Sequence, residues 1–156
     1  MMSADLLRLN FDEVRRRSQK VWTAIPADRL GFRVDPQCMS LIEQVRHVLE
    51  DDFNYAEMLR SGGDLPPGPT PWDGRALGSV EDEVRFAAPY RQAFLDLVAG
   101  FSERDLAERT VSRPSRGYVR TFGDFLLRIA YHEAVHTGQL LRDLRHAGCP
   151  RPNIWD

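Results

Sequence analysis

Three of the four histidines in this chain have a spacing that suits metal binding. His132 and His136 are four residues apart, so in a helix they lie one turn apart on the same face. A metal ion held by such a pair normally needs a third ligand from another segment, and His47 is the only other histidine that lies well inside a predicted helix and not at its end. Imidazole suits Zn, Ni, Fe and Cu. We therefore predict a divalent-metal site on these three residues, with His146 outside it as a partner of a helix C-terminus.

Acidic side chains beside the histidines are candidates for a supporting or catalytic role. Asp51 and Asp143 fall on the same helical faces as the histidines, where a carboxylate can hold a ring N–H group, although either could simply be solvated. Glu133 points by its helical angle into an apolar face, where a carboxylate needs a partner. It is either a proton-transfer group of the site or a buried glutamate paired with an arginine. We take Glu133 and Asp51 as the catalytic candidates.

Four helices are needed to position these residues. Apolar periodicity, capping residues and Gly or Pro breakers predict helices over about 3–23, 40–60, 79–99 and 121–147. The segment 61–79 between the second and third contains the run SGGDLPPGPTPWDG, which is too rich in Gly and Pro for a regular element. It is expected to be a crossover, and Trp72 makes it a candidate lid over the site. With at most a short hairpin around 109–120, the prediction is an all-α four-helix bundle.

Composition bounds the possible functions. The chain has 156 residues, a length that predicts a single domain over 1–156. Its formal net charge of −2, with scattered arginines, gives no reason to expect a nucleic-acid partner. No apolar run approaches the ~20 residues of a membrane helix, and the N-terminus does not resemble a signal peptide, so we expect a cytoplasmic protein without membrane contact. Cys38 and Cys149 have no metal-binding spacing.

Two longer runs resemble the DinB/YfiT-like superfamily, which is unrelated to the DNA polymerase that shares the name. The run TFGDFLLRIAYHEAVHTGQ, residues 121–139, is similar to the last helix of that family, and SLIEQVRHVLE, residues 40–50, is similar to its first ligand-bearing helix. The resemblance spans about residues 3–152. It implies a four-helix bundle with a crossover between helices two and three, a nickel or zinc ion on His47, His132 and His136, and frequent homodimers.

The resemblance also implies a range of activities. Some relatives are thiol S-transferases or thiol-dependent isomerases that use bacillithiol, mycothiol or glutathione, and many have no assigned activity. This sequence departs from the mycothiol-dependent isomerase pattern, in which a glutamate replaces one histidine of the helix-four pair. We expect a metal-dependent enzyme that activates a low-molecular-weight thiol, or water, against a small-molecule substrate.

Three other interpretations stay open at this point. The protein could be a non-enzymatic metal-binding stress protein, or a bundle that has lost its metal. The run His132-Glu133-Ala-Val-His136 also matches the H-E-x-x-H signature of zinc metallohydrolases, in which Glu133 would be the general base. That interpretation is disfavoured because few residues follow His136 to supply a downstream third ligand.

Overall fold

The computed structural model describes residues 3–155 and confirms the four long helices. They are α1 (Ser3–Thr23), α2 (Leu41–Ser61), α3 (Val80–Ala99) and α5 (Phe122–His146). Shorter elements connect them: the 3₁₀ turns η1 (Ala27–Arg29) and η2 (Pro114–Arg116), the helix α4 (Glu103–Glu108), and the strands β1 (Thr110–Arg113) and β2 (Tyr118–Thr121). Among these residues no helix combines the length and the apolar character needed to cross a membrane.

Side-chain caps fix the starts of the helices that carry the histidines. The hydroxyl of Ser40 accepts a hydrogen bond from the backbone N–H of Glu43, and the Glu43 carboxylate accepts one from the backbone N–H of Ser40. This reciprocal capping box satisfies two amides that the first turn of α2 would otherwise leave unpaired. Thr121 caps α5 in a similar way by accepting from the N–H of Asp124. Both ligand-bearing helices therefore begin at positions set by local sequence.

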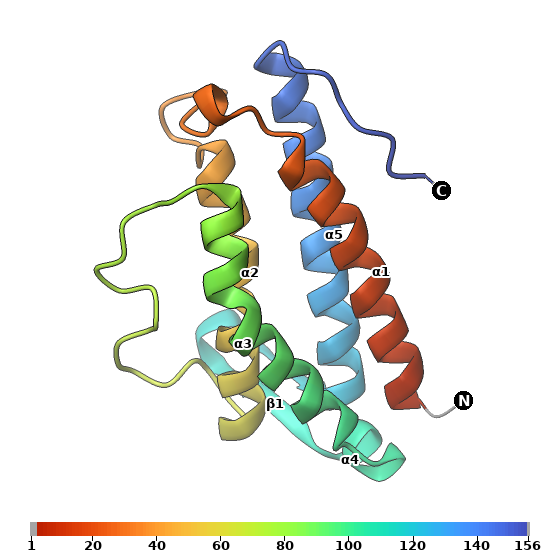
Figure 1. Ribbon diagram of the computed structural model, residues 1–156. Coiled ribbons are helices and arrows are strands. Elements are labelled where there is room, and N and C mark those ends of the chain that lie inside the picture. The colour runs from red at the N-terminus through yellow and green to blue at the C-terminus, as the bar shows by residue number, and fades with distance from the viewer. Residues whose placement is uncertain (1–2, 156) are drawn as a thin grey trace.

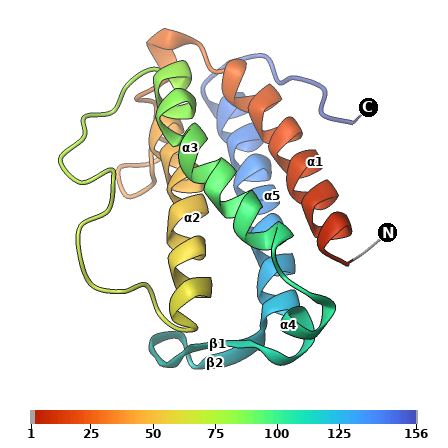
Figure 2. The ribbon, with the colours of Figure 1, turned by 60° about the horizontal axis from the view of Figure 1, so that its bottom comes forward.

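The four helices form a bundle in which α2 and α3 run in the same direction. Figure 1 shows α1 and α5 rising together from the end of the molecule that carries α4, while α2 and α3 descend towards it. Each of α1 and α2 packs against both α3 and α5. Because α2 and α3 are parallel neighbours, the chain between them must return along the whole bundle, and residues 62–79 do so as the long excursion visible in Figures 1 and 2. The predicted crossover is therefore confirmed.

Trp72 anchors this crossover to the bundle. Its side chain is buried, and its ring lies 5.0 Å from that of Tyr90, 5.3 Å from Phe86 and 6.5 Å from Phe53 between centroids. These partners belong to α2 and α3, and none of them is a histidine. Trp72 thus fills the seam between α2 and α3, and the ring contacts give it the role of a core residue and not of a lid.

A two-stranded hairpin precedes α5, close to the position expected from the sequence. Strands β1 and β2 pair antiparallel, with Thr110 opposite Thr121 and Arg113 opposite Tyr118. Gly117, at φ 70°, supplies the left-handed residue that the connecting turn requires. The N–H of Ser112 donates to the carbonyl of Gly62 at 2.9 Å, which fastens the hairpin to the end of α2.

The interior consists of two apolar clusters with a polar layer between them. One cluster lies towards the hairpin and includes Phe11, Phe94 and Phe125; the other lies towards the opposite end and includes Trp22 and Leu140. On every long helix, a buried or half-buried polar residue sits between members of the two clusters: Arg15 on α1, Asp52 on α2, Arg91 on α3 and Glu133 on α5. The predicted metal ligands lie beside this layer on α2 and α5.

Candidate metal centre

The three predicted metal ligands converge between α2 and α5. The ring of His47 lies 5.3 Å from that of His132 and 4.7 Å from that of His136, and the last two rings are 4.5 Å apart, all between centroids. One ring nitrogen from each of the three lies within 4.8 Å of the others. The helical spacing of the pair on α5 and the capping of α2 together bring the rings to one place. The sequence prediction thus identified residues that meet in space.

Asp51 supports this cluster from α2. Its Oδ2 atom lies 2.9 Å from Nδ1 of His132, which is ion-pair distance, although the two atoms are not aligned as a hydrogen bond, and the Asp51 side chain is largely buried. His47 and Asp51 are one turn apart on α2, so the same helical face carries a candidate ligand and the carboxylate that holds another. A carboxylate on the second nitrogen of a ligating histidine orients the ring and leaves its Nε2 atom free to bind.

His136 is the most enclosed of the three histidines. Its side chain is buried, and burial, together with the neighbouring His132 and His47, lowers its pKa from the usual 6.5 to about 4. The ring is therefore neutral at physiological pH, which is the form that binds metals. Its Nδ1 atom is buried without a hydrogen-bond partner among residues 3–155. A buried, neutral imidazole with an unpaired nitrogen is unfavourable in a protein interior unless a partner completes it.

These observations fit a divalent metal ion. The Nε2 atoms of His132 and His136 lie 3.0 Å apart. Two nitrogens that bind one zinc ion at its usual bond length would be about 3 to 3.4 Å apart, depending on the coordination angle. Three imidazoles are a donor set that suits Zn and Ni, and they leave coordination positions open. The geometry is thus that of a site able to hold a metal ion.

Glu133, predicted as a proton-transfer candidate, is paired in the core with Arg15 of α1. Its Oε1 atom accepts from Nε of Arg15 at 2.8 Å, and its Oε2 atom accepts from Nη2 of the same guanidinium at 3.1 Å. The side chain is buried. Of the two roles considered from the sequence, the buried glutamate paired with an arginine is the one that these contacts match. A catalytic role for Glu133 stays a prediction.

Two further sequence candidates lie apart from the cluster. Asp143 is buried, but its carboxylate accepts from Nε2 of Gln44 and from Nε of Arg142, each at 2.8 Å, and not from a histidine. It therefore links α2 to α5 at another level of the bundle. His146 is exposed in the last turn of α5, where it was expected.

The buried cation at the centre of the polar layer was not singled out from the sequence. Arg15 is 8 % exposed, and its guanidinium donates to Asp52 as well as to Glu133. A signal for it was present, because Arg15 follows Phe11 by four residues and precedes Trp22 by seven, which puts it in the apolar stripe of α1. A charged residue at core spacing implies a buried partner of opposite charge.

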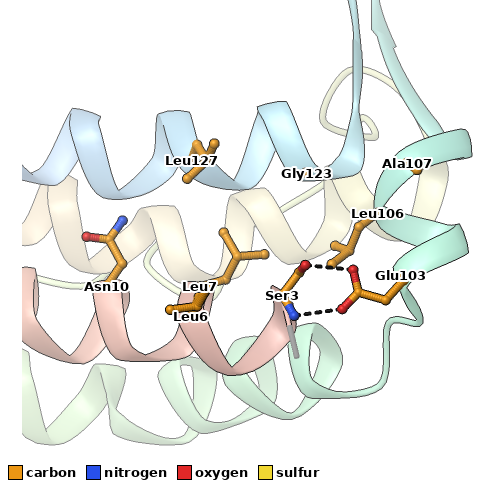
Figure 3. Close-up of a pocket in the computed structure, with 9 residues that line it drawn as sticks. All are labelled: Ser3, Leu6, Leu7, Asn10, Glu103, Leu106, Ala107, Gly123 and Leu127. Carbon is orange, nitrogen blue, oxygen red and sulfur yellow. Dashed lines mark hydrogen bonds between the residues drawn. The ribbon is translucent and has the colours of Figure 1, made fainter. Parts of the chain in front are cut away.

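A separate apolar hollow lies elsewhere on the surface, between α1, α4 and α5. Its volume is about 490 Å³, and Leu6, Leu106 and Leu127 are among the residues that line it. Figure 3 shows the polar end of this hollow, where both carboxylate oxygens of Glu103 are bonded to the backbone N–H and the hydroxyl of Ser3. No histidine lines it, so it is distinct from the candidate metal centre.

Comparisons with known proteins agree with the fold. The model of the DinB superfamily matches residues 10–140. A DinB-like protein, YjoA, from Bacillus subtilis superposes with a TM-score of 0.71 at 19% identity, with 96% of each chain covered. A DinB-like protein from Bacillus cereus superposes with a TM-score of 0.72 at 17% identity, with 96% of this chain and 95% of that chain covered. No curated protein matches the sequence. The family match covers most of the chain and the fold agrees with it, and the protein therefore belongs to the DinB superfamily.

Proposed function

We propose that this protein binds one divalent metal ion, zinc or nickel, through His47, His132 and His136, and uses it to activate a low-molecular-weight thiol or water. The observation that carries the proposal is the convergence of three ring nitrogens from two helices within 4.8 Å of one another. When bound, a divalent ion supplies Lewis acidity that favours the deprotonated form of a thiol or of water near neutral pH.

The surrounding side chains have separable tasks in this proposal. Asp51 holds Nδ1 of His132 and thereby fixes the direction of its other ring nitrogen. The enclosure of His136 keeps that imidazole neutral. The side chain of His132 is 33 % exposed, so the cluster is open to solvent on the side where a small ligand would enter. The protein thus contributes an oriented donor set with an open face.

Arg128 suggests which chemical group the bound thiol carries. It precedes His132 by one turn of α5, is exposed, and stacks on the ring of Tyr118 with its guanidinium carbon 5.3 Å from the centroid. Two other arginines share that ring, but Arg113 is paired with Asp64 and Arg120 with Asp124.

Within residues 3–155 no carboxylate pairs with Arg128. An unpaired guanidinium one helical turn from His132 favours a thiol that carries a carboxylate.

A metal-loading experiment tests the first part. We expect about one ion per chain in the wild type after incubation with Zn²⁺ or Ni²⁺ and desalting, measured by mass spectrometry of the metal. His132→Ala and His136→Ala should lose it. His146→Ala, which removes an exposed histidine from the end of the same helix, is the matched control and should keep it. A wild type that cannot be loaded would refute the proposal.

Thiol chemistry then separates an enzyme from a metal-binding stress protein. We expect the loaded protein to accelerate conjugation of a thiol with a generic aromatic electrophile, and a chelator to abolish the acceleration. A loaded protein without any such activity would favour the non-enzymatic alternative. Activity indifferent to the chelator would contradict the metal-dependent proposal.

The role of Arg128 is tested with paired ligands. Calorimetric titration of the loaded protein with 3-mercaptopropionate and with 3-mercapto-1-propanol compares two thiols that differ in one carboxylate. Arg128→Gln should weaken the binding of the acid by about tenfold and leave the alcohol unchanged. Arg145→Gln, at the far end of α5, serves as the control for net charge. An equal effect of Arg128→Gln on both thiols would rule out carboxylate recognition.

A further inference from the structure

The polar layer across the middle of the bundle is a closed network of ion pairs. Arg15 of α1 donates through Nε and Nη2 to Glu133 of α5, and through Nη1 and Nη2 to Oδ2 of Asp52 of α2 at 3.1 Å. Arg91 of α3 donates to the other oxygen of Asp52 at 3.0 Å and to the carbonyl of Phe11 at 2.8 Å. Two cations and two carboxylates from four helices thus balance each other.

Residues of this network are next to residues of the candidate metal centre in the sequence. Asp52 follows Asp51 on α2, and Glu133 follows His132 on α5. Consecutive helical residues point about 100° apart, so each pair sends one side chain to the cluster and the other to Arg15. The contact between Asp51 and His132 and the bridge from Asp52 through Arg15 to Glu133 are therefore two adjacent links between α2 and α5.

The energetics of such a network favour a role in geometry. Taking charges out of water is unfavourable, and well-packed apolar replacements of buried ion pairs are often as stable as the originals. The two apolar clusters on either side would hold the helices together without it. What the guanidinium adds is geometric specificity, because its planar fork of N–H donors favours particular directions for the carboxylates that it binds.

We propose that Arg15 is a positioning residue of the metal centre. By fixing Asp52 and Glu133 at set distances, it holds α2 and α5 in the register that brings His47 to His132 and His136. This inference rests on the proposed metal-binding function. It assigns Arg15 no contact with the metal or with a ligand.

The decisive variant is Arg15→Met combined with Glu133→Leu. It removes one cation and one carboxylate, so the charge balance is kept, and Asp52 remains paired with Arg91. The double variant should resist urea about as well as the wild type, while its affinity for Zn²⁺ falls about tenfold or more. The absorption spectrum of bound Co²⁺, which reports coordination geometry, should change as well. A purely structural network would show the opposite pattern, with stability lost and affinity kept.

Two further variants of this chain complete the test. Glu83→Gln breaks a different buried ion pair, that of Arg46 on α2 with Glu83 on α3, and should lose stability without losing metal affinity. Arg15→Lys keeps the charge but not the fork, and it serves if the double variant does not fold. We expect it to weaken Zn²⁺ binding severalfold. Unchanged affinity and an unchanged Co²⁺ spectrum in a folded Arg15 variant would overturn the inference.

A metal-free measurement separates this inference from the proposed function. The imidazole ¹H–¹⁵N resonances of the three clustered histidines should shift in the Arg15 variants relative to the wild type, and they should stay in place in Glu83→Gln. If the wild type binds no metal, the proposed function fails, and these resonances still decide whether Arg15 positions the rings. Unshifted resonances would refute the positioning role.

Discussion

Nδ1 of His132 lies 2.9 Å from Oδ2 of Asp51, so a candidate metal ligand on α5 is in contact with a carboxylate on α2. The two helices are far apart in sequence, and this contact makes the orientation of one ligand depend on how they pack. A carboxylate in this position favours one orientation of the imidazole and the tautomer whose Nε2 atom can bind a metal ion. The relationship leads directly to a test of how much the supporting carboxylate contributes.

Asp51→Asn should weaken metal binding without abolishing it. The amide has nearly the same shape as the carboxylate but lacks its charge, so it can no longer stabilise positive charge on the imidazole. Affinity for Zn²⁺ should fall about 10- to 100-fold, the usual effect of removing such a partner. Competition with a chromophoric chelator measures it.

The matched control is Asp28→Asn, which changes an exposed carboxylate next to Arg29 in η1. It removes the same charge and should leave the affinity unchanged. Equal affinities for wild type and Asp51→Asn would mean that His132 does not use Asp51 as its support.

Glu83→Gln should destabilise the bundle by about 3 kcal/mol, because it leaves Arg46 without its buried partner. Oε1 of Glu83 accepts from Nη2 of Arg46 at 2.6 Å, and Oε2 accepts from Nε at 2.8 Å. Burial alone would raise the pKa of Glu83, but the hydrogen bonds from Arg46 and from the N–H of Gly78 hold it below its usual value. Urea denaturation at neutral pH gives the difference in the free energy of unfolding.

The pH dependence of that difference supplies a second check. A carboxyl group whose pKa is lower in the folded state stabilises the protein above its unfolded pKa of about 4.3, and the contribution is lost as pH falls below that value. The gap between wild type and Glu83→Gln should therefore shrink in acid. A gap that is constant down to pH 3 would contradict the lowered pKa.

Trp72→Ala should destabilise the fold by about 3 to 5 kcal/mol and leave metal affinity unchanged. The indole is 4 % exposed and packs on Phe53, Phe86 and Tyr90. Trp72→Phe should destabilise the fold much less, because an aromatic ring remains and the lost Nε1–H has no partner among the described residues. Reduced metal affinity in Trp72→Ala would show that the crossover does act as a lid.

The sequence predicted the parts of this protein that local patterns control. The helix bounds followed from caps such as Ser40 and Thr121 and from glycine and proline breakers, and the pair His132 and His136 followed from helical spacing. His47 followed as the third ligand because such a pair needs one from another segment, and the resemblance to a known family implied the same residue. These features depend on residues close together in the chain or on short sequence motifs.

Long-range pairing was harder to predict. That Glu133 would meet Arg15 depends on how α1 packs against α5, and 118 residues separate the two in sequence. A charged residue in an apolar stripe implies a buried partner of opposite charge, but the sequence does not identify that partner. Trp72 was similarly ambiguous, because an aromatic residue in a Gly/Pro-rich loop suits both a lid and an anchor. Only the packing of α3 beside α2 distinguishes the two.

The metal-free protein should lose stability between pH 6.5 and pH 4 because of His136. Burial and the neighbouring His132 and His47 lower its folded pKa to about 4, whereas the unfolded chain has the usual value near 6.5. Between these values the unfolded state binds the additional proton, so acid favours unfolding, and the contribution is complete above pH 6.5. The loss should approach about 3 kcal/mol by pH 4.

Urea denaturation with a chelator present, repeated across this range, measures that loss. His136→Gln should show a flatter profile, because glutamine does not titrate, while His146→Ala should keep the wild-type slope because His146 is exposed. Parallel profiles for wild type and His136→Gln would mean that His136 titrates near 6.5 in the folded protein. In that case a proton would compete with a metal ion for His136 at mildly acidic pH. A neutral His136 instead leaves its ring available to metal across the whole range above pH 4.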